Sequence, residues 1–258
     1  MNAFRKYLPI LLFFCLITPG FASFAGDEAD DTSRYNTAGA LYRESDFRGA
    51  LNIYEELIGE GITNPDLYYN ASNAAYRNGS LGKAILYLER ALKLAPSEKD
   101  ALANLAFLNS MKEDQEGDNS NVVLEFLSRR YNAINVNSAA LWSGITFIVT
   151  MVLLTVSLFV RAWKRMVFIA TAVLFSLVCL TASIIFIQKI HHNSITVEAV
   201  IMGEEAPAYS GPGTENTHIF TIHEGTKVVI ERSQNSWNLI RLNSGAGGWI
   251  QGELMEKI

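Results

Sequence analysis

Tyrosine and arginine side chains recur at a fixed interval in the N-terminal half of this 258-residue sequence. The pairs, each 34 residues apart, are Tyr35 and Tyr69, Tyr42 and Tyr76, and Arg43 and Arg77. Asn73, which belongs to no pair, lies between Tyr69 and Tyr76. Aromatic and arginine side chains are the usual anchors of protein–protein interfaces. This pattern therefore predicts the binding of a partner rather than the making or breaking of a covalent bond.

Residue types that perform catalysis are scattered along the chain. An active site brings together a nucleophile, a base and a group that orients the base. His191 and His192 follow an apolar stretch, and we expect His218 and His223 to be separate surface side chains. No carboxylate–histidine spacing would place metal ligands on one face, and the turn at residues 210–213 lacks the lysine of a phosphate-binding loop. The sequence thus predicts a protein that is not an enzyme, with no metal and no cofactor.

The composition argues against two further classes. The chain is 49% hydrophobic and 18% charged, with a formal net charge of -5. Nucleic-acid binding needs a clustered basic surface facing the phosphates, which this sequence does not offer. The two cysteines, Cys15 and Cys179, lie in apolar stretches. We therefore expect the soluble parts to depend on packed cores rather than on disulfides.

Residues 1–25 are predicted to be an export signal. Two basic residues precede an apolar run at residues 8–17, and small residues follow it. That order is typical of a secretory signal peptide, and the run is too short to cross ~30 Å of hydrocarbon as a helix. Cleavage is expected after Ala25; cleavage after Ala22 and retention as an anchor are the alternatives.

Small residues and asparagines follow the same interval between residues 33 and 117. The small residues are Ala38, Ser72 and Ala106, and Ala50 and Ala84; the asparagines are Asn36, Asn70 and Asn104. Small side chains allow two helices to approach closely. The pattern resembles the tetratricopeptide repeat (TPR), a pair of antiparallel helices, and predicts an all-α repeat domain over 33–117. A lone third helix at 98–114 is expected to cap the stack with a polar outer face.

The resemblance implies a concave groove that holds peptides and is lined by the first helix of each pair. The side chains that it places there are Tyr35, Tyr42, Arg43, Tyr69, Asn73, Tyr76 and Arg77. The alternative is that the tyrosines only pack between repeats and that Asn36, Asn70 and Asn104 only bond to turns. Residues 26–121 contain 17 acidic and 9 basic side chains, which argues against a strongly acidic ligand.

Two uncharged stretches, at 138–160 and 166–188, follow a polar linker at 118–137. Each stretch is long enough to cross a bilayer as a helix. Residues 122–131 are expected either to lie on the membrane as an amphipathic helix or to serve as a plain connector. The loop at 161–165 is basic, and short basic loops stay in the cytoplasm. Both soluble domains are therefore expected on the periplasmic, extracytoplasmic side of a bacterial inner (cytoplasmic) membrane, with membrane lipid around the hairpin.

The two stretches have no ionisable residue near their middles. Transporters and proton pumps depend on such groups within the membrane. We therefore expect an anchor, or a docking surface for other helices. Ala172 and Ser176, four residues apart, would let another helix approach closely.

Residues 195–258 change to a two-residue alternation, with turn residues between five short stretches. This pattern predicts a small all-β barrel. The landmarks are Pro207-x-Tyr209-Ser210-Gly211-Pro212, Glu224-Gly225-Thr226-Lys227-Val228, Trp237-x-x-x-Arg241-Leu242 and Gly248-Trp249-Ile250. Their order resembles the bacterial Src-homology-3-like (SH3-like) domain. Tyr209, Trp237 and Trp249 would form a ligand shelf; the alternative is that both tryptophans are partly buried barrel residues.

The order of signal, repeats, membrane hairpin and SH3-like domain resembles the TPR proteins of the Bat (Bacteroides aerotolerance) operons, the BatE type. The resemblance implies a non-catalytic membrane scaffold with a link to oxygen or oxidative-stress tolerance. Its implied partners are membrane proteins with von Willebrand A-type domains and a MoxR-type ATPase. The alternative function is binding of the cell envelope, with the SH3-like domain holding peptidoglycan.

Overall fold

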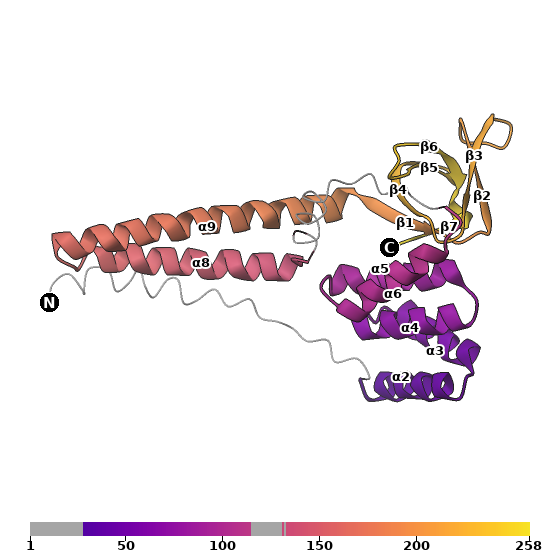
Figure 1. Ribbon diagram of the computed structural model, residues 1–258, viewed down its shortest axis with the longest axis horizontal. Helices are drawn as coiled ribbons and strands as arrows, with labels where there is room; N and C mark the ends of the chain where they lie inside the picture. Colours follow the sequence, from indigo (N-terminus) through magenta and orange to yellow (C-terminus); the bar gives the residue numbers. More distant parts are fainter. Residues whose placement is uncertain (1–27, 115–130, 132) are drawn as a thin grey trace. The chain divides into compact units, whose positions relative to one another are not determined.

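The computed structural model describes residues 28–114, 131 and 133–258 (Figure 1). The predicted signal peptide lies outside the described residues, as does the segment at 122–131 except for Tyr131. The chain divides into two compact units, Met1–Arg34 and Tyr35–Ile258, of which the second is the larger. That unit contains stacked helices, a pair of long helices and a β-sheet. The predicted multidomain fold class is therefore confirmed.

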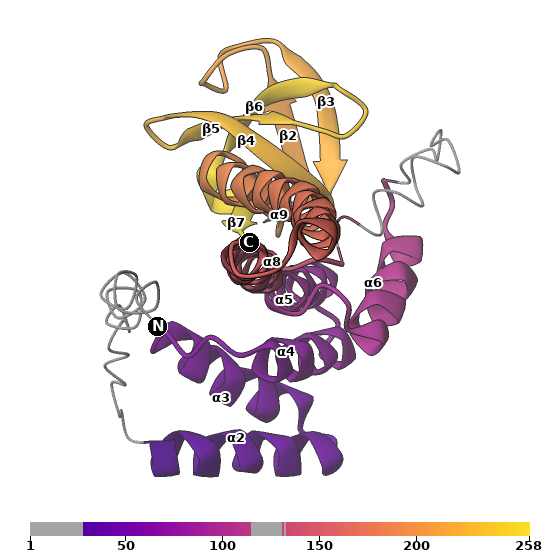
Figure 2. The same ribbon diagram turned by 90° about the vertical axis from the view of Figure 1, so that its left-hand side faces the viewer.

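Successive helices pack against one another in the N-terminal part of the described chain (Figures 1 and 2). They are α2 (Glu28–Arg43), α3 (Phe47–Gly59), α4 (Pro65–Arg77), α5 (Leu81–Leu94) and α6 (Lys99–Met111). The second pair has clear local signals. The Asn64 side chain accepts hydrogen bonds from the first amides of α4, and Pro65 suits the first helical position. Gly79, with a φ of 83°, follows α4 in the left-handed conformation that glycine adopts without strain.

Small residues lie where these helices meet. Ala38, Ala50, Ser72 and Ala84 are each at most 1% exposed, as predicted. Ser72 also donates its hydroxyl to the carbonyl of Ala84 at 2.7 Å, so this polar group is satisfied inside the core. Ala106, by contrast, is exposed. Within the described residues no partner helix directly follows α6 to cover it.

The outer side of α6 is apolar, which corrects the prediction of a polar cap. Ala101 and Leu108 are buried, whereas Leu102, Phe107 and Met111 are 46%, 52% and 48% exposed. Apolar residues lie on more than one side of this helix, and α5 covers only one of them. The periodicity therefore predicted the helix correctly but not the chemistry of its free face.

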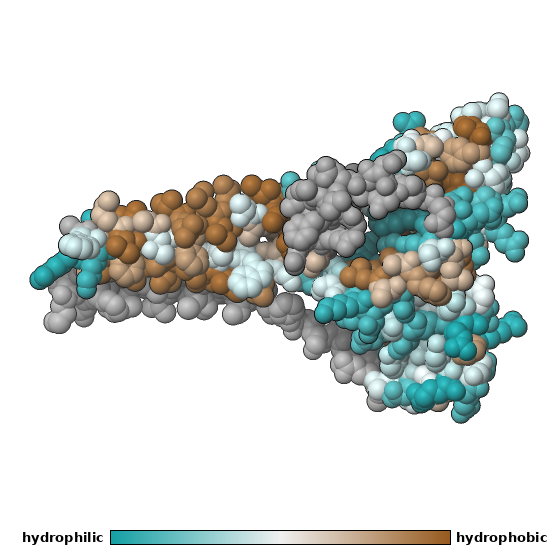
Figure 3. Space-filling view, in the orientation of Figure 1, coloured by the Kyte–Doolittle hydropathy of each residue, from teal (hydrophilic) through white to brown (hydrophobic). Residues whose placement is uncertain are grey.

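Helices α8 (Val136–Ser157) and α9 (Ala162–Ile195) lie side by side as an antiparallel hairpin (Figures 1 and 2). The hydroxyls of Ser143 and Ser183 hydrogen-bond across it at 2.8 Å. The buried residues of the hairpin are small or carry hydroxyls: Ala139, Thr146, Thr150, Ser157 and Ala172. Large apolar side chains point outward and give the hydrophobic surface over these helices in Figure 3. Both helices are long and apolar enough to cross a membrane.

Two details of the hairpin differ from the sequence prediction. The connection lies at 158–161 rather than at 161–165, because α8 ends at Ser157 and α9 begins at Ala162, and the Arg165 amide donates to the Arg161 carbonyl at 2.9 Å. Cations do not break a helix, so these residues continue it. Ala172 is 1% exposed and packs within the hairpin, whereas Ser176 is exposed. These two residues therefore do not form one face for an additional helix.

The C-terminal domain is a seven-stranded antiparallel sheet with the order β3-β2-β6-β5-β4-β1-β7. Its strands are β1 (Val197–Ile201), β2 (Glu205–Tyr209), β3 (His218–His223), β4 (Lys227–Gln234), β5 (Trp237–Arg241), β6 (Gly247–Gln251) and β7 (Met255–Lys257). The all-β prediction is confirmed, but five strands were too few. The sheet is open, with β3 and β7 at its edges, and Ala208, Ile222, Ile240 and Ile250 lie in its core.

Candidate functional site

A groove of about 480 Å³ lies among α2, α3 and α4. Its lining residues are Tyr35, Asn36, Gly39, Tyr42, Arg43, Tyr54, Asn70 and Asn73. Tyrosines, asparagines and one arginine line it, and none of these residues is a carboxylate. The groove can therefore donate hydrogen bonds and stack on apolar or peptide groups, which is the chemistry of binding.

Tyrosine–asparagine pairs link neighbouring repeats on the groove side. Asn70 Nδ2 donates to the Tyr35 hydroxyl at 2.6 Å, and one repeat later Asn104 Nδ2 donates to the Tyr69 hydroxyl at 3.2 Å. Asn104 also donates to Asn73 Oδ1 at 3.2 Å. The alternative in which Asn70 and Asn104 only bond to turns is therefore wrong. These asparagines hold the tyrosines in place, so both residue types combine a structural role with a position at the groove.

Tyr54 contributes a hydroxyl to the groove from α3. Its ring lies 5.8 Å from that of Tyr35. Burial is the main cause that raises the pKa of Tyr54 to about 12, with the neighbouring Tyr35 acting in the same direction and Arg43 opposing it. Burial also raises the pKa of Tyr35, against the hydrogen bond from Asn70. Both hydroxyls are therefore neutral near pH 7 and can donate or accept a hydrogen bond.

Two of the predicted groove residues, Tyr76 and Arg77, pack against neighbouring helices. Tyr76 contacts Phe107 of α6 edge to face, with ring centroids 5.7 Å apart. The Arg77 guanidinium lies over the Phe47 ring at 4.3 Å, a cation–π contact. Tyr42, which lines the groove, also meets the Phe47 ring edge to face, with ring centroids 5.2 Å apart. Substituting Tyr76 or Arg77 would therefore disturb the packing of the helices as well as the binding of any ligand.

The structure thus brings four of the seven predicted residues into one groove: Tyr35, Tyr42, Arg43 and Asn73. It places Tyr69, Tyr76 and Arg77 in contacts along the neighbouring helices. Sequence reasoning did not assign Asn36, Gly39, Tyr54 and Asn70 to the groove. The interval already related Asn36 to Asn70, and Gly39 follows Ala38, one of the small residues at that interval, but Tyr54 belongs to a second helix and had no comparable signal.

An aromatic cluster lies in the C-terminal sheet. Tyr209 meets Trp237 edge to face at 5.6 Å and meets His218 at 5.9 Å, and it pairs with Trp249 across β2 and β6. Trp237 and Trp249 are each only 9% exposed. The predicted residues are therefore together, but the burial of both indoles favours a packing role.

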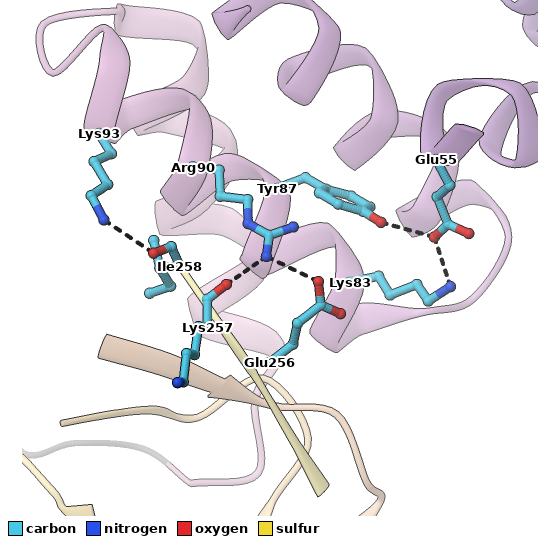
Figure 4. A network of polar contacts seen from close by, with 8 residues as sticks. All are labelled: Glu55, Lys83, Tyr87, Arg90, Lys93, Glu256, Lys257 and Ile258. Carbon is cyan, nitrogen blue, oxygen red and sulfur yellow. Dashed lines mark hydrogen bonds and ion pairs between the residues drawn. The ribbon is translucent and has the colours of Figure 1, made fainter. Parts of the chain in front are cut away.

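One side of helix α5 contacts the C-terminal sheet (Figure 4). Arg90 donates to Glu256 at 2.9 Å and to the Lys257 carbonyl, and Lys93 donates to the Ile258 carbonyl at 3.0 Å. On the repeat side of the same network, Glu55 of α3 accepts from Tyr87 and Lys83 of α5. Val200 of β1 belongs to the same buried cluster as the repeat core. The groove has no lining residue from α5 or the sheet, so this contact leaves it open.

The turn between β3 and β4 is bound by the start of α5 and by the segment that follows α6. The Asp114 carboxylate accepts from the His223 amide at 2.7 Å and from the Thr226 hydroxyl at 2.8 Å, and its second oxygen lies 3.0 Å from the His223 ring nitrogen. The Glu224 carboxylate accepts from the Gly82 amide at 2.6 Å. His223 is therefore not a separate surface side chain, which corrects the prediction. Its partner lies 109 residues earlier, a separation with no trace in the local sequence.

We expect this contact to weaken as the pH rises above 6.5. The hydrogen bond to Asp114 raises the pKa of His223 above its ordinary 6.5, with Asp114, Glu113 and Glu205 adding to it and burial opposing it. The stabilisation is thus complete below pH 6.5 and is lost as the pH rises through the raised pKa. Thermal unfolding of the full chain across this range should show a falling midpoint that the His223→Gln variant lacks.

The acidic limit of the same contact has the opposite sign. Burial works to raise the pKa of Asp114, but the hydrogen bonds from His223 and Thr226 outweigh it and leave that pKa below 3.8. Its stabilisation is present above pH 3.8 and is lost as the pH falls through the lowered pKa.

The prediction for His223 would be contradicted if the thermal unfolding midpoint of wild type changed as little as that of His223→Gln when the pH is raised above 6.5.

No group of three or more metal-binding side chains occurs among the residues that the structure describes. What the described residues do form is a stack of antiparallel helix pairs beside a polar, aromatic groove. That arrangement defines a helical-repeat protein. Residues 65–98, which contain α4 and α5, match the tetratricopeptide repeat family model. No curated protein matches the chain.

Proposed function

We propose that this protein is a non-catalytic, membrane-anchored scaffold whose repeat groove binds a segment of a partner protein. The observation that carries the proposal is the open groove of about 480 Å³, lined by tyrosine, asparagine and arginine side chains and without a carboxylate. TPR repeats are typically interaction modules, and the repeat match at residues 65–98 supports the same function.

The hairpin is proposed as the membrane anchor. The outward side chains of α8 and α9 are large and apolar, and such a surface is costly in water. Three cations, Arg161, Lys164 and Arg165, lie where the two helices join. Short basic segments stay in the cytoplasm. The proposed topology therefore places the repeat domain and the C-terminal sheet on the extracytoplasmic side of a bacterial inner membrane.

The proposed assembly follows the resemblance to the BatE-type proteins. The partners would be membrane proteins with von Willebrand A-type domains, and the role would concern aerotolerance or oxidative stress. Peptidoglycan binding through an SH3-like C-terminal domain is the weaker candidate. The two indoles that would form its ligand shelf, Trp237 and Trp249, are 9% exposed.

A substitution at Gly39 tests the groove without weakening its helix. A Cβ at this position would meet Arg43 at 3.5 Å and Tyr54 at 3.9 Å, which are ordinary contacts. Gly39→Ala is therefore tolerated, and we expect α2 to gain roughly 0.5–1 kcal/mol in stability because alanine favours the helix. Gly39→Leu keeps most of that gain but extends an isobutyl group into the groove. We expect it to reduce partner binding by at least about tenfold, since it displaces about 1.4 kcal/mol or more of ligand contacts.

The measurement is crosslinking in intact cells, followed by detergent purification and mass spectrometry of the proteins recovered. The expected result is equal recovery of a von Willebrand A-type membrane protein with wild type and Gly39→Ala, and a large loss with Gly39→Leu. Equal recovery with all three chains would exclude the groove as the binding site. Recovery of cell-wall fragments crosslinked to residues 195–258, with no protein partner, would favour the envelope-binding alternative.

A further inference from the structure

The end of the hairpin where α8 joins α9 carries a concentrated positive charge. Lys164 and Arg165 follow Arg161 by three and four residues, and all three are exposed. The Arg165 amide donates to the Arg161 carbonyl at 2.9 Å, so helical geometry already holds over this segment. Residues at that spacing share one side of a helix and lie about 5–6 Å apart at their Cβ atoms. The three cations therefore repel one another from one small patch.

No carboxylate of the hairpin neutralises this patch. The sequence has no Asp or Glu between Glu125 and Glu198. Within the part of the chain that the structure describes, the ion pairs involve other residues and none joins Arg161, Lys164 or Arg165. Like charges at this spacing are destabilising. An external anion would relieve that repulsion.

The surroundings of the patch are apolar and equally exposed. Leu158, Phe159, Met166 and Val167 are 64%, 59%, 71% and 59% exposed, and Trp163 is 86% exposed. Aromatic side chains of this kind lie at the headgroup level of membranes. A ligand complementary to the whole surface therefore combines a negative group with hydrocarbon chains.

We propose that Arg161, Lys164 and Arg165 bind the phosphate of anionic phospholipids in the leaflet where the hairpin turns. The inference rests on the proposed membrane anchoring and adds a lipid preference to it. The cations contact the phosphodiester, while the neighbouring apolar side chains contact the acyl chains. Each cation near an anionic membrane surface adds about a fivefold preference for anionic over uncharged lipid. The patch thus gives the anchor a selectivity that its uncharged helices do not have.

The test compares two triple variants of the full chain with equal loss of charge. One carries Arg161→Gln, Lys164→Gln and Arg165→Gln; the control carries Arg48→Gln, Lys99→Gln and Arg232→Gln, at exposed positions of the soluble domains. Each protein is reconstituted in vesicles of phosphatidylcholine and phosphatidylglycerol, re-extracted in detergent and washed. The retained lipids are then quantified by mass spectrometry.

Wild type and the control are expected to retain phosphatidylglycerol above its share in the vesicles, and the hairpin variant to retain both lipids in the supplied ratio. Enrichment that persists in the hairpin variant, or that falls equally in the control, would overturn the proposal. A wild type that reconstitutes but shows no enrichment would overturn it while leaving the anchor intact. A wild type that fails to enter vesicles would overturn the anchor, and the lipid preference with it.

Discussion

Replacing Gly82 with alanine is expected to lower the stability of the docked protein by about 1–3 kcal/mol, although alanine is the better helix former. Gly82 is buried in the first turn of α5, against the C-terminal sheet. A Cβ there would lie 2.9 Å from the backbone oxygen of Ile201 and 2.9 Å from Cγ of Glu224. The Glu224 side chain can move, but the Ile201 carbonyl belongs to β1 and cannot. The added methyl therefore pushes the sheet away from α5.

Gly59 provides the matched control. It is the last residue of α3, and a Cβ there would have no atom within 4 Å. Gly59→Ala should therefore leave the docking intact and raise the free energy of unfolding by up to about 0.5 kcal/mol through helix propensity alone. The two substitutions are chemically identical, so opposite signs isolate the contact with the sheet.

Hydrogen exchange of the full chain distinguishes lost docking from general unfolding. The Gly82 amide donates to Glu224 across this contact, and the Ile201 amide, beside it, donates to the Thr226 carbonyl within the C-terminal domain. In Gly82→Ala we expect faster exchange along β1 and the start of α5, with little change in α3 and α4. Unchanged exchange at these amides, or a stability gain equal to that of Gly59→Ala, would refute the docked arrangement.

Replacing Lys227 with methionine is expected to destabilise the protein by about 2 kcal/mol, below the 3–5 kcal/mol of a fully buried pair because the group is partly hydrated. The Lys227 ammonium lies 3.0 Å from Glu89 of α5 and 3.0 Å from Glu198 of β1, and its side chain is 30% exposed. Burial works to lower the pKa of Lys227, but the two carboxylates outweigh it and raise that pKa, so the charge persists at neutral pH. Methionine keeps the volume but leaves two carboxylates facing each other without a cation.

A second substitution tests whether charge is the cause. Combining Lys227→Met with Glu89→Gln removes most of the repulsion and should restore most of the lost stability, as urea unfolding would measure. The control is Lys83→Met, whose partner Glu55 lies 2.7 Å away within the repeat domain and whose side chain is 41% exposed. That change should cost less than about 1 kcal/mol, as exposed pairs do. If the double variant is no more stable than Lys227→Met, the electrostatic explanation fails.

The groove was predicted in part because its residues repeat. The interval that relates Tyr35 to Tyr69 also relates Asn70 to Asn104, and the structure joins these residues in equivalent hydrogen bonds. Tyr54 reaches the groove from α3, and only helix packing decides that. The same reason explains the free face of α6. Periodicity predicts that a helix forms, whereas the neighbours that it finds determine which side is covered.

Local patterns in the sequence predicted the elements: the helix pairs from their interval, the hairpin from two uncharged stretches, and the C-terminal strands from alternation. These signals are local, because each depends on residues within a few turns or one repeat. How α5 meets the sheet, by contrast, follows from the folded domains. The contact between Asp114 and His223 and that between Gly82 and Glu224 join residues more than one hundred positions apart. Such pairs depend on shape and charge complementarity between finished domains, and complementarity of that kind has no period in the sequence.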